Sequence, residues 1–162
     1  MIDEQTKILK FMSEMKTRID MGEFARKVGL SSAQIAQHMQ DLASAGYLKK
    51  VGGGFAITEK GKAALKYETV LPENSKFRFY LSEGNPTDFY AASVKEFREN
   101  VLKVDAAALE FHLNRGDFEN WFQSSIADSS FADELVKIKK MNLSGEELRK
   151  AILKAIDLKY ML

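Results

Sequence analysis

Apolar residues recur at helical spacing in short segments at the start of the chain. In residues 4–16 this spacing predicts a first amphipathic helix, whose apolar face is formed by Ile8, Phe11, Met12 and Met15. Asp20 and Glu23 then have the spacing of a capping box, in which each side chain accepts a hydrogen bond from the other residue's backbone N–H. They predict a short second helix that ends at Gly29.

Ser31 and Gln34 repeat the capping-box spacing and predict a third helix over residues 32–44. Its apolar face is formed by Ile35, Met39 and Leu42. The short second helix, the turn at residues 29–31 and the third helix together match the spacing of a helix-turn-helix.

Two short strand-like runs, residues 47–51 and 55–58, follow the third helix and flank three glycines, Gly52, Gly53 and Gly54. This pattern predicts a β-hairpin with the glycines at its tip, where a positive φ is tolerated. Thr58 can cap a last helix over residues 59–66. The order helix, helix, helix, hairpin, helix is that of a winged helix.

A family resemblance lies in the run VGLSSAQIAQHMQDLASAGYLKKVGGGFAITEKGKAAL, residues 28–65. The run resembles the winged helix-turn-helix of prokaryotic transcription regulators of the MarR and PadR type. The resemblance implies that the helix at residues 32–44 enters a DNA major groove while the hairpin at residues 49–55 follows the backbone. Such regulators often carry a serine and an arginine where this chain has Ala36 and Gln37, so one phosphate anchor is missing.

The predicted DNA-binding residues lie on the outward face of the third helix and on the hairpin. They are Ser32, Ala33, Gln34, Gln37, Gln40, Lys49, Lys50 and Gly53. Gln37 can pair bidentately with adenine, whereas Gln34 is favoured as a partner in the capping box. Because consecutive strand residues point to opposite faces, only one of Lys49 and Lys50 is expected to meet a phosphate.

The glycine-rich run also has to be weighed as a nucleotide-binding loop. Gly61 and Lys62 provide the glycine-lysine pair of such a loop, but Ala63 follows where serine or threonine is required. We therefore interpret the glycines as a tight hairpin tip whose bare backbone can approach DNA.

A second, mostly helical domain is predicted after a polar segment that contains a proline. The expected division is a winged helix-turn-helix at residues 1–67, a linker at 68–75 and the second domain at 76–162. A strand is expected at residues 76–81 and a turn at 83–86. Helix starts are predicted from Ser93 with Glu96, Asp105, Asp117, Asp128 and Ser144 with Glu147. The predicted fold class is mainly α (α+β), with one or two short strands in the second domain.

The densest chemistry of the second domain lies in the run ALEFHLNRGDFENWFQSSIAD, residues 108–128. The aromatic residues are expected to fill a core and Asp117 to cap a helix. Alternatively, His112, Arg115, Asp117 and Trp121 form a ligand or partner pocket. A catalytic site is disfavoured because no nucleophile or second metal ligand accompanies the histidine. From about Phe77 onward the chain resembles an uncharacterised archaeal and bacterial domain family, which implies a fold unit but no role.

Composition changes this picture in two ways. The chain of 162 residues contains no cysteine, so disulfides and thiolate metal sites are excluded. The net charge of +1 divides into +4 for residues 1–66 and −3 for the remainder. A modest basic excess in the first part is compatible with a polyanionic partner.

We expect a cytoplasmic, non-enzymatic regulator that binds double-stranded DNA, without a cofactor, a metal or a membrane span. Its second domain is expected to form a homodimer or to sense an unidentified effector. The alternative is an adaptor that uses the winged helix to bind proteins, and the few cations on the third helix favour it.

Overall fold

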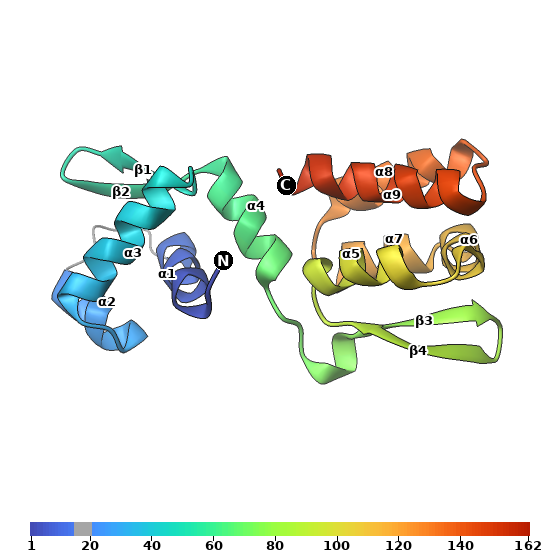
Figure 1. Cartoon of the computed structure of the whole chain (residues 1–162), viewed down its shortest axis with the longest axis horizontal. Coiled ribbons are helices and arrows are strands. Elements are labelled where there is room, and N and C mark those ends of the chain that lie inside the picture. The colour runs from blue at the N-terminus through green and yellow to red at the C-terminus, as the bar shows by residue number, and fades with distance from the viewer. Residues whose placement is uncertain (15–20) are drawn as a thin grey trace. The chain divides into compact units, whose positions relative to one another are not determined.

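The computed structural model describes residues 1–14 and 21–162 of the chain, which is mainly helical with two small antiparallel sheets (Figure 1). It divides into two compact units, Met1–Leu65 and Lys66–Leu162, each with its own hydrophobic core. The mainly helical fold class agrees with the prediction from the sequence. Met15, Arg18 and the predicted cap at Asp20 lie outside the described residues.

In its described residues, the first unit contains three helices, a hairpin and the start of a fourth helix. Its elements are α1 (Asp3–Glu14), α2 (Met21–Val28), α3 (Ser32–Ser44), β1 (Leu48–Val51), β2 (Gly54–Ile57) and α4 (Glu59–Glu68). The predicted apolar face of α3 is buried, together with residues of α1, α2 and β1: Ile8, Leu9, Phe24, Ala25, Ile35, Met39, Leu42 and Leu48. Contact with α1, α2 and β1 thus holds α3 by one face and leaves its other face outward.

The β1–β2 hairpin has a shorter tip than its three glycines predict. Val51 pairs with Gly54, so Gly54 belongs to β2 and the turn contains only Gly52 and Gly53. Gly52 has φ of 55°, a left-handed conformation that glycine adopts at little cost. The correction follows from the pairing, because a two-residue turn lets the second strand begin one residue earlier, at Gly54.

The segment that follows the hairpin joins α4 to the end of α3. The Thr58 hydroxyl accepts a hydrogen bond from Gly61 N–H at 3.0 Å, which confirms it as a cap, and donates one to Gly46 O at 2.6 Å. Lys60 Nζ donates to Ala45 O at 2.8 Å. A Cβ on Gly61 would lie 2.3 Å from Tyr47 O, so only glycine allows this close packing. This segment is therefore a structural junction and not a nucleotide-binding loop.

The second unit places a hairpin and a pair of helices on opposite sides of α5 and α6 (Figure 1). Its elements are η1 (Glu73–Ser75), β3 (Phe77–Ser82), β4 (Asn85–Ala91), α5 (Val94–Lys103), α6 (Ala106–Arg115), α7 (Asp117–Ser124), α8 (Ser129–Lys140) and α9 (Gly145–Lys159). β3 contacts α6 and β4 contacts α5, while α9 packs against both helices. The core between these layers is rich in aromatic rings.

Residues 68–75, the expected linker, make contacts within the second unit. Leu71 packs against its core and donates a backbone hydrogen bond to Ala92 O at 2.7 Å. Ser75 O accepts a hydrogen bond from Trp121 Nε1 at 2.8 Å. The boundary between the units falls inside α4, between Leu65 and Lys66.

The predicted caps of the second unit hold only in part. Ser93, Asp105 and Asp128 each accept a backbone hydrogen bond at the start of a helix, as expected. Ser144 occupies the cap position of α9, but its side chain makes no capping hydrogen bond. Asp117 was also predicted wrongly, because Gly116 caps α7 and Asp117 is the first helical residue. Its carboxylate instead binds side chains of α6.

Candidate functional site

The outward face of α3 is polar and open to solvent. Ser32, Ala33, Gln34, Gln37 and Gln40 are all exposed, because the three buried positions of the helix turn these residues away from the core. The five predicted DNA-binding residues of α3 are therefore all accessible to solvent.

Gln34 is engaged in the capping box. Its Oε1 accepts a hydrogen bond from Ser31 N–H at 2.9 Å, while Ser31 Oγ accepts one from Gln34 N–H at 3.2 Å. The favoured interpretation from the sequence is thus confirmed, and only the amide nitrogen of Gln34 stays available for another contact.

Gln37 donates a hydrogen bond from Nε2 to Asp41 Oδ1, 2.9 Å away on the next turn. Asp41 was not among the predicted residues, and its exposed carboxylate adds a negative charge beside Gln37 and Gln40. A carboxylate repels phosphates but can accept a hydrogen bond from the amino group of cytosine. Asp41 lies four residues after Gln37, and this spacing in the sequence could have identified it as a neighbour of Gln37 on the helix surface.

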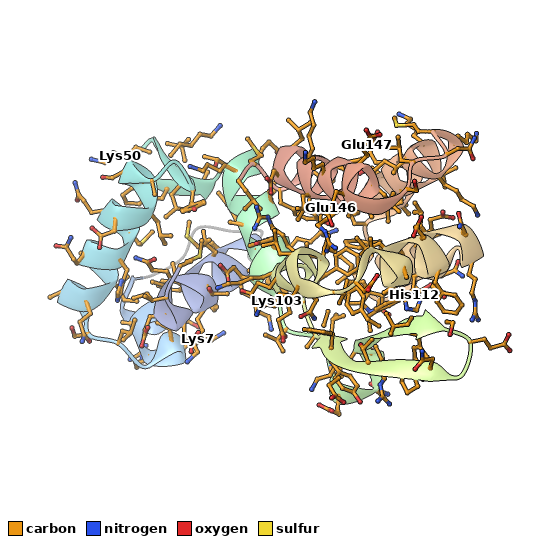
Figure 2. The ribbon with its side chains drawn as sticks, turned by 45° about the vertical axis from the view of Figure 1, so that its right-hand side comes forward. Lys7, Lys50, Lys103, His112, Glu146 and Glu147 are labelled. Carbon is orange, nitrogen blue, oxygen red and sulfur yellow. The ribbon has the colours of Figure 1, made fainter. Side chains whose placement is uncertain are left out.

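The hairpin turns its two lysines to opposite faces, and both are exposed. Lys50, labelled in Figure 2, pairs with the half-buried Phe55. Alternation along the strand puts it on the same face as the buried Leu48. Lys49 pairs with Ala56 and points to the other face. Gly53 lies between the strands in the exposed turn.

A second candidate site is a cleft of about 510 Å³ formed by β3, α6 and α7. The lining residues are Lys76, Phe77, Arg78, Tyr80, Glu83, Gly84, Phe111, His112, Arg115, Asp117 and Asn120. Three of the four predicted pocket residues, His112, Arg115 and Asp117, are therefore brought together. Trp121 is not among the lining residues. Its ring stacks on Phe97, with ring centroids 5.6 Å apart, and it belongs to the core.

His112 is buried and connects three elements around the cleft (Figure 2). Its Nε2 accepts a hydrogen bond from Tyr80 N–H at 2.7 Å, so this nitrogen carries no proton. The proton is therefore on Nδ1, which donates to Asp117 Oδ2 at 2.9 Å. Burial lowers the pKa of His112, although the hydrogen bond to Asp117 acts in the opposite direction. His112 is a neutral structural link whose ring nitrogens are both occupied.

Arg115 lies at the end of α6 and is tied to the cleft from two sides. Its guanidinium carbon lies 4.8 Å from the centroid of the Phe111 ring, a cation–π arrangement. Its Nε lies 3.5 Å from Asp117 Oδ2, the oxygen that also binds His112. Within the described residues, the two terminal nitrogens of Arg115 have no hydrogen-bond partner.

The opposite side of the cleft comes from β3 and the residue before it, which were not predicted as site residues. Lys76, Arg78 and Tyr80 share one face of this segment, whereas Phe77 and Phe79 point into the core. The alternation of polar and apolar residues in 76–81 could have indicated that shared face. Only the fold places it against Phe111 and Arg115.

Neither site has the features of a metal centre. No group of three or more His, Asp or Glu side chains in residues 1–14 and 21–162 could hold a metal ion. None of the helices in this described part has the length and apolar character of a membrane span. No known family model matches the chain, and comparison with curated proteins and with solved structures finds no significant similarity.

Proposed function

We propose that the first unit is a winged helix-turn-helix that binds double-stranded DNA, with α3 in the major groove and the hairpin along the backbone. One observation carries the proposal. A helix packed through its whole apolar face presents small and amide side chains to solvent, next to a glycine-tipped hairpin with two exposed lysines. Amide and hydroxyl groups on an exposed helix face are suited to reading the edges of base pairs.

The same surface is poorly suited to a protein partner. Protein interfaces obtain most of their binding energy from a few large anchors, chiefly Trp, Tyr and Arg. In the described part of the first unit, the large hydrophobic residues that are exposed are Ile2 and Val51, at 51% and 46%. Neither lies on α3, so the adaptor hypothesis lacks an anchor on this helix.

The small number of cations sets the expected affinity. Lys49 and Lys50 are the cations of the predicted surface, and Asp41 opposes them, so one copy should bind duplex weakly. We therefore include a homodimer in the proposal, in which the second unit holds two copies together and each copy reads a half-site. A non-enzymatic regulator of this kind acts in the cytoplasm of a prokaryotic cell.

The proposal is tested by fluorescence anisotropy with a labelled duplex of mixed sequence. We expect binding at about 50 mM salt that weakens only gradually up to about 200 mM, because few phosphates are neutralised. The double variant Lys49→Glu/Lys50→Glu should bind more weakly and reduce the salt slope by about 1 for each phosphate that a lysine no longer neutralises. The two single variants then show which lysine meets the backbone.

The matched control is Lys150→Glu/Lys154→Glu, which makes the same charge change at exposed positions of α9. It should leave DNA binding intact. Equal weakening by both double variants would mean that only net charge matters, and no binding at low salt would refute the proposal.

Asp41→Asn should strengthen DNA binding in the same assay, because it removes the carboxylate beside Gln37.

A further inference from the structure

We propose that the cleft between β3, α6 and α7 binds a small organic anion, in which a carboxylate or phosphate group is attached to a flat apolar body. The anionic group pairs with Arg115 and with the cations of the β3 segment, and the apolar body lies against Phe111 and Tyr80. The inference concerns the second unit and does not rest on DNA binding by the first.

The charges of the cleft favour an anion. Lys76, Arg78 and Arg115 line it, against the two carboxylates of Glu83 and Asp117. Asp117 pairs with Arg115, so Lys76 and Arg78 remain against Glu83 and the lining keeps a net charge of +1. Lys76 Nζ lies 2.7 Å from a carboxylate oxygen of Glu73, but the Glu73 side chain is 85% exposed. An incoming anion can therefore replace Glu73 at low cost.

Arg115 is held in place before any ligand arrives. The Phe111 ring lies against one face of its guanidinium and Asp117 Oδ2 lies 3.5 Å from Nε, while the terminal nitrogens have no hydrogen-bond partner in the described part of the chain. The side chain is 53% exposed, so these nitrogens can be reached from solvent. A planar fork of this kind matches the two oxygens of a carboxylate or phosphate.

His112 and Asp117 act as positioning residues for Arg115. The neutral imidazole donates to Asp117, and Asp117 in turn restrains Arg115, while Nε2 holds Tyr80 through its backbone N–H. One buried side chain thus fixes both walls of the cleft. Such restraint reduces the side-chain entropy lost on binding.

Arg78 holds the other wall in a similar way. Its Nε donates to Thr87 O at 3.0 Å, and its guanidinium carbon lies 5.0 Å from the ring centroid of Tyr90 and 5.8 Å from that of Tyr80. Within the described residues its terminal nitrogens have no hydrogen-bond partner. The lining of the cleft therefore includes two guanidinium groups, each of which lies over an aromatic ring.

The test is an NMR titration of the full chain with four probes: benzoate, phenyl phosphate, acetate and neutral benzamide. We expect benzoate or phenyl phosphate to shift the backbone amide signals of Tyr80, Phe111 and Arg115, with a dissociation constant on the order of 1 mM. Acetate should bind more weakly because it lacks the ring. Benzamide should bind more weakly because it lacks the charge. The preferred member of the anionic pair shows whether the cleft favours a carboxylate or a phosphate group.

Arg115→Gln should weaken binding of the preferred probe at least tenfold, and Arg78→Gln should weaken it to a smaller extent. Lys103→Gln is the control, because it removes the same charge from an exposed position of α5 that does not line the cleft. A dispersed amide spectrum of each variant shows that the fold is retained. The proposal is overturned if benzamide binds as well as the preferred anionic probe, if no probe shifts the cleft signals, or if Arg115→Gln binds like the unchanged protein.

Discussion

The two units place their polar groups in opposite ways. In the first unit the buried side chains of the described residues are all apolar, and hydrogen-bonding groups lie on the surface of α3 and the hairpin. The second unit contains the buried polar side chains of the described part, Ser93, His112 and Asp128. The first unit therefore carries its hydrogen-bonding side chains on an open face, whereas the second also buries some, of which His112 lines the cleft.

The cores differ in a matching way. The core of the first unit is mainly aliphatic, with Phe24 as its large fully buried ring. In the second unit the Phe97 ring lies within about 6.3 Å of five other aromatic centroids, those of Phe77, Phe79, Phe118, Trp121 and Phe122. Edge-to-face rings restrict one another's orientation, and such rigidity is what a preformed cleft requires.

Removing the centre of each core should have the largest effect. We expect Phe97→Ala to destabilise the second unit by about 3–5 kcal/mol and Ile35→Ala to destabilise the first by about 2–5 kcal/mol, because both side chains are fully buried. Differential scanning calorimetry should show two transitions, of which each variant lowers one. Leu102→Ala, at a half-exposed position of α5, is the control and should change little. A single transition lowered by both variants would contradict the independence of the two units.

Overpacking the junction at Gly61 should have the next largest effect and should act on the first unit alone. The added methyl of Gly61→Ala would meet Tyr47 O at 2.3 Å and Ile57 Cγ1 at 2.7 Å, so the hairpin or α4 must move. We expect a loss of about 1–3 kcal/mol in urea denaturation. Gly54→Ala is the matched control, since no atom lies within 4 Å of its added Cβ. If both variants were equally stable, the close packing of α4 on the hairpin would be disproved.

The features predicted correctly from the sequence depend on residues close together in the chain. Ser31 with Gln34, and Asp128 with Phe131, bind across three positions, so spacing alone identifies them. Asp117 was predicted wrongly because its carboxylate turns back to His112 and Arg115 across the helix break. The Lys76 and Arg78 wall was missed because residues more than 30 positions later complete the cleft. Local pattern carries no information on such contacts.

The same capping device can be compared in the two units. Asp128 is buried and also accepts a hydrogen bond from the Tyr160 hydroxyl at 2.7 Å, whereas Ser31 is an exposed cap. We expect Asp128→Ala to cost about 1–3 kcal/mol, because it leaves buried donors without a partner. Ser31→Ala should cost about 1 kcal/mol. Urea denaturation measures both, and a double-mutant cycle with Tyr160→Phe isolates the Tyr160 contribution. Equal losses would mean that burial adds nothing to the cap.

Acidification should give the smallest effect and should destabilise the second unit through His112. Burial lowers the pKa of His112 in the folded chain, so between that value and about 6.5 the unfolded chain binds more protons. The contribution of His112 to the free energy of unfolding is therefore complete above about pH 6.5 and is lost as the pH falls, because a protonated Nε2 could no longer accept the Tyr80 N–H.

The measurement is urea denaturation of the unchanged protein and of His112→Gln at about pH 7 and pH 5. The variant should have the lower free energy of unfolding at pH 7 but should lose less of it on acidification. Ionisable groups that do not contact His112 are common to both proteins, so the difference between the two pH profiles isolates His112 and its partner Asp117. Identical profiles would mean that His112 is not held neutral between Tyr80 and Asp117.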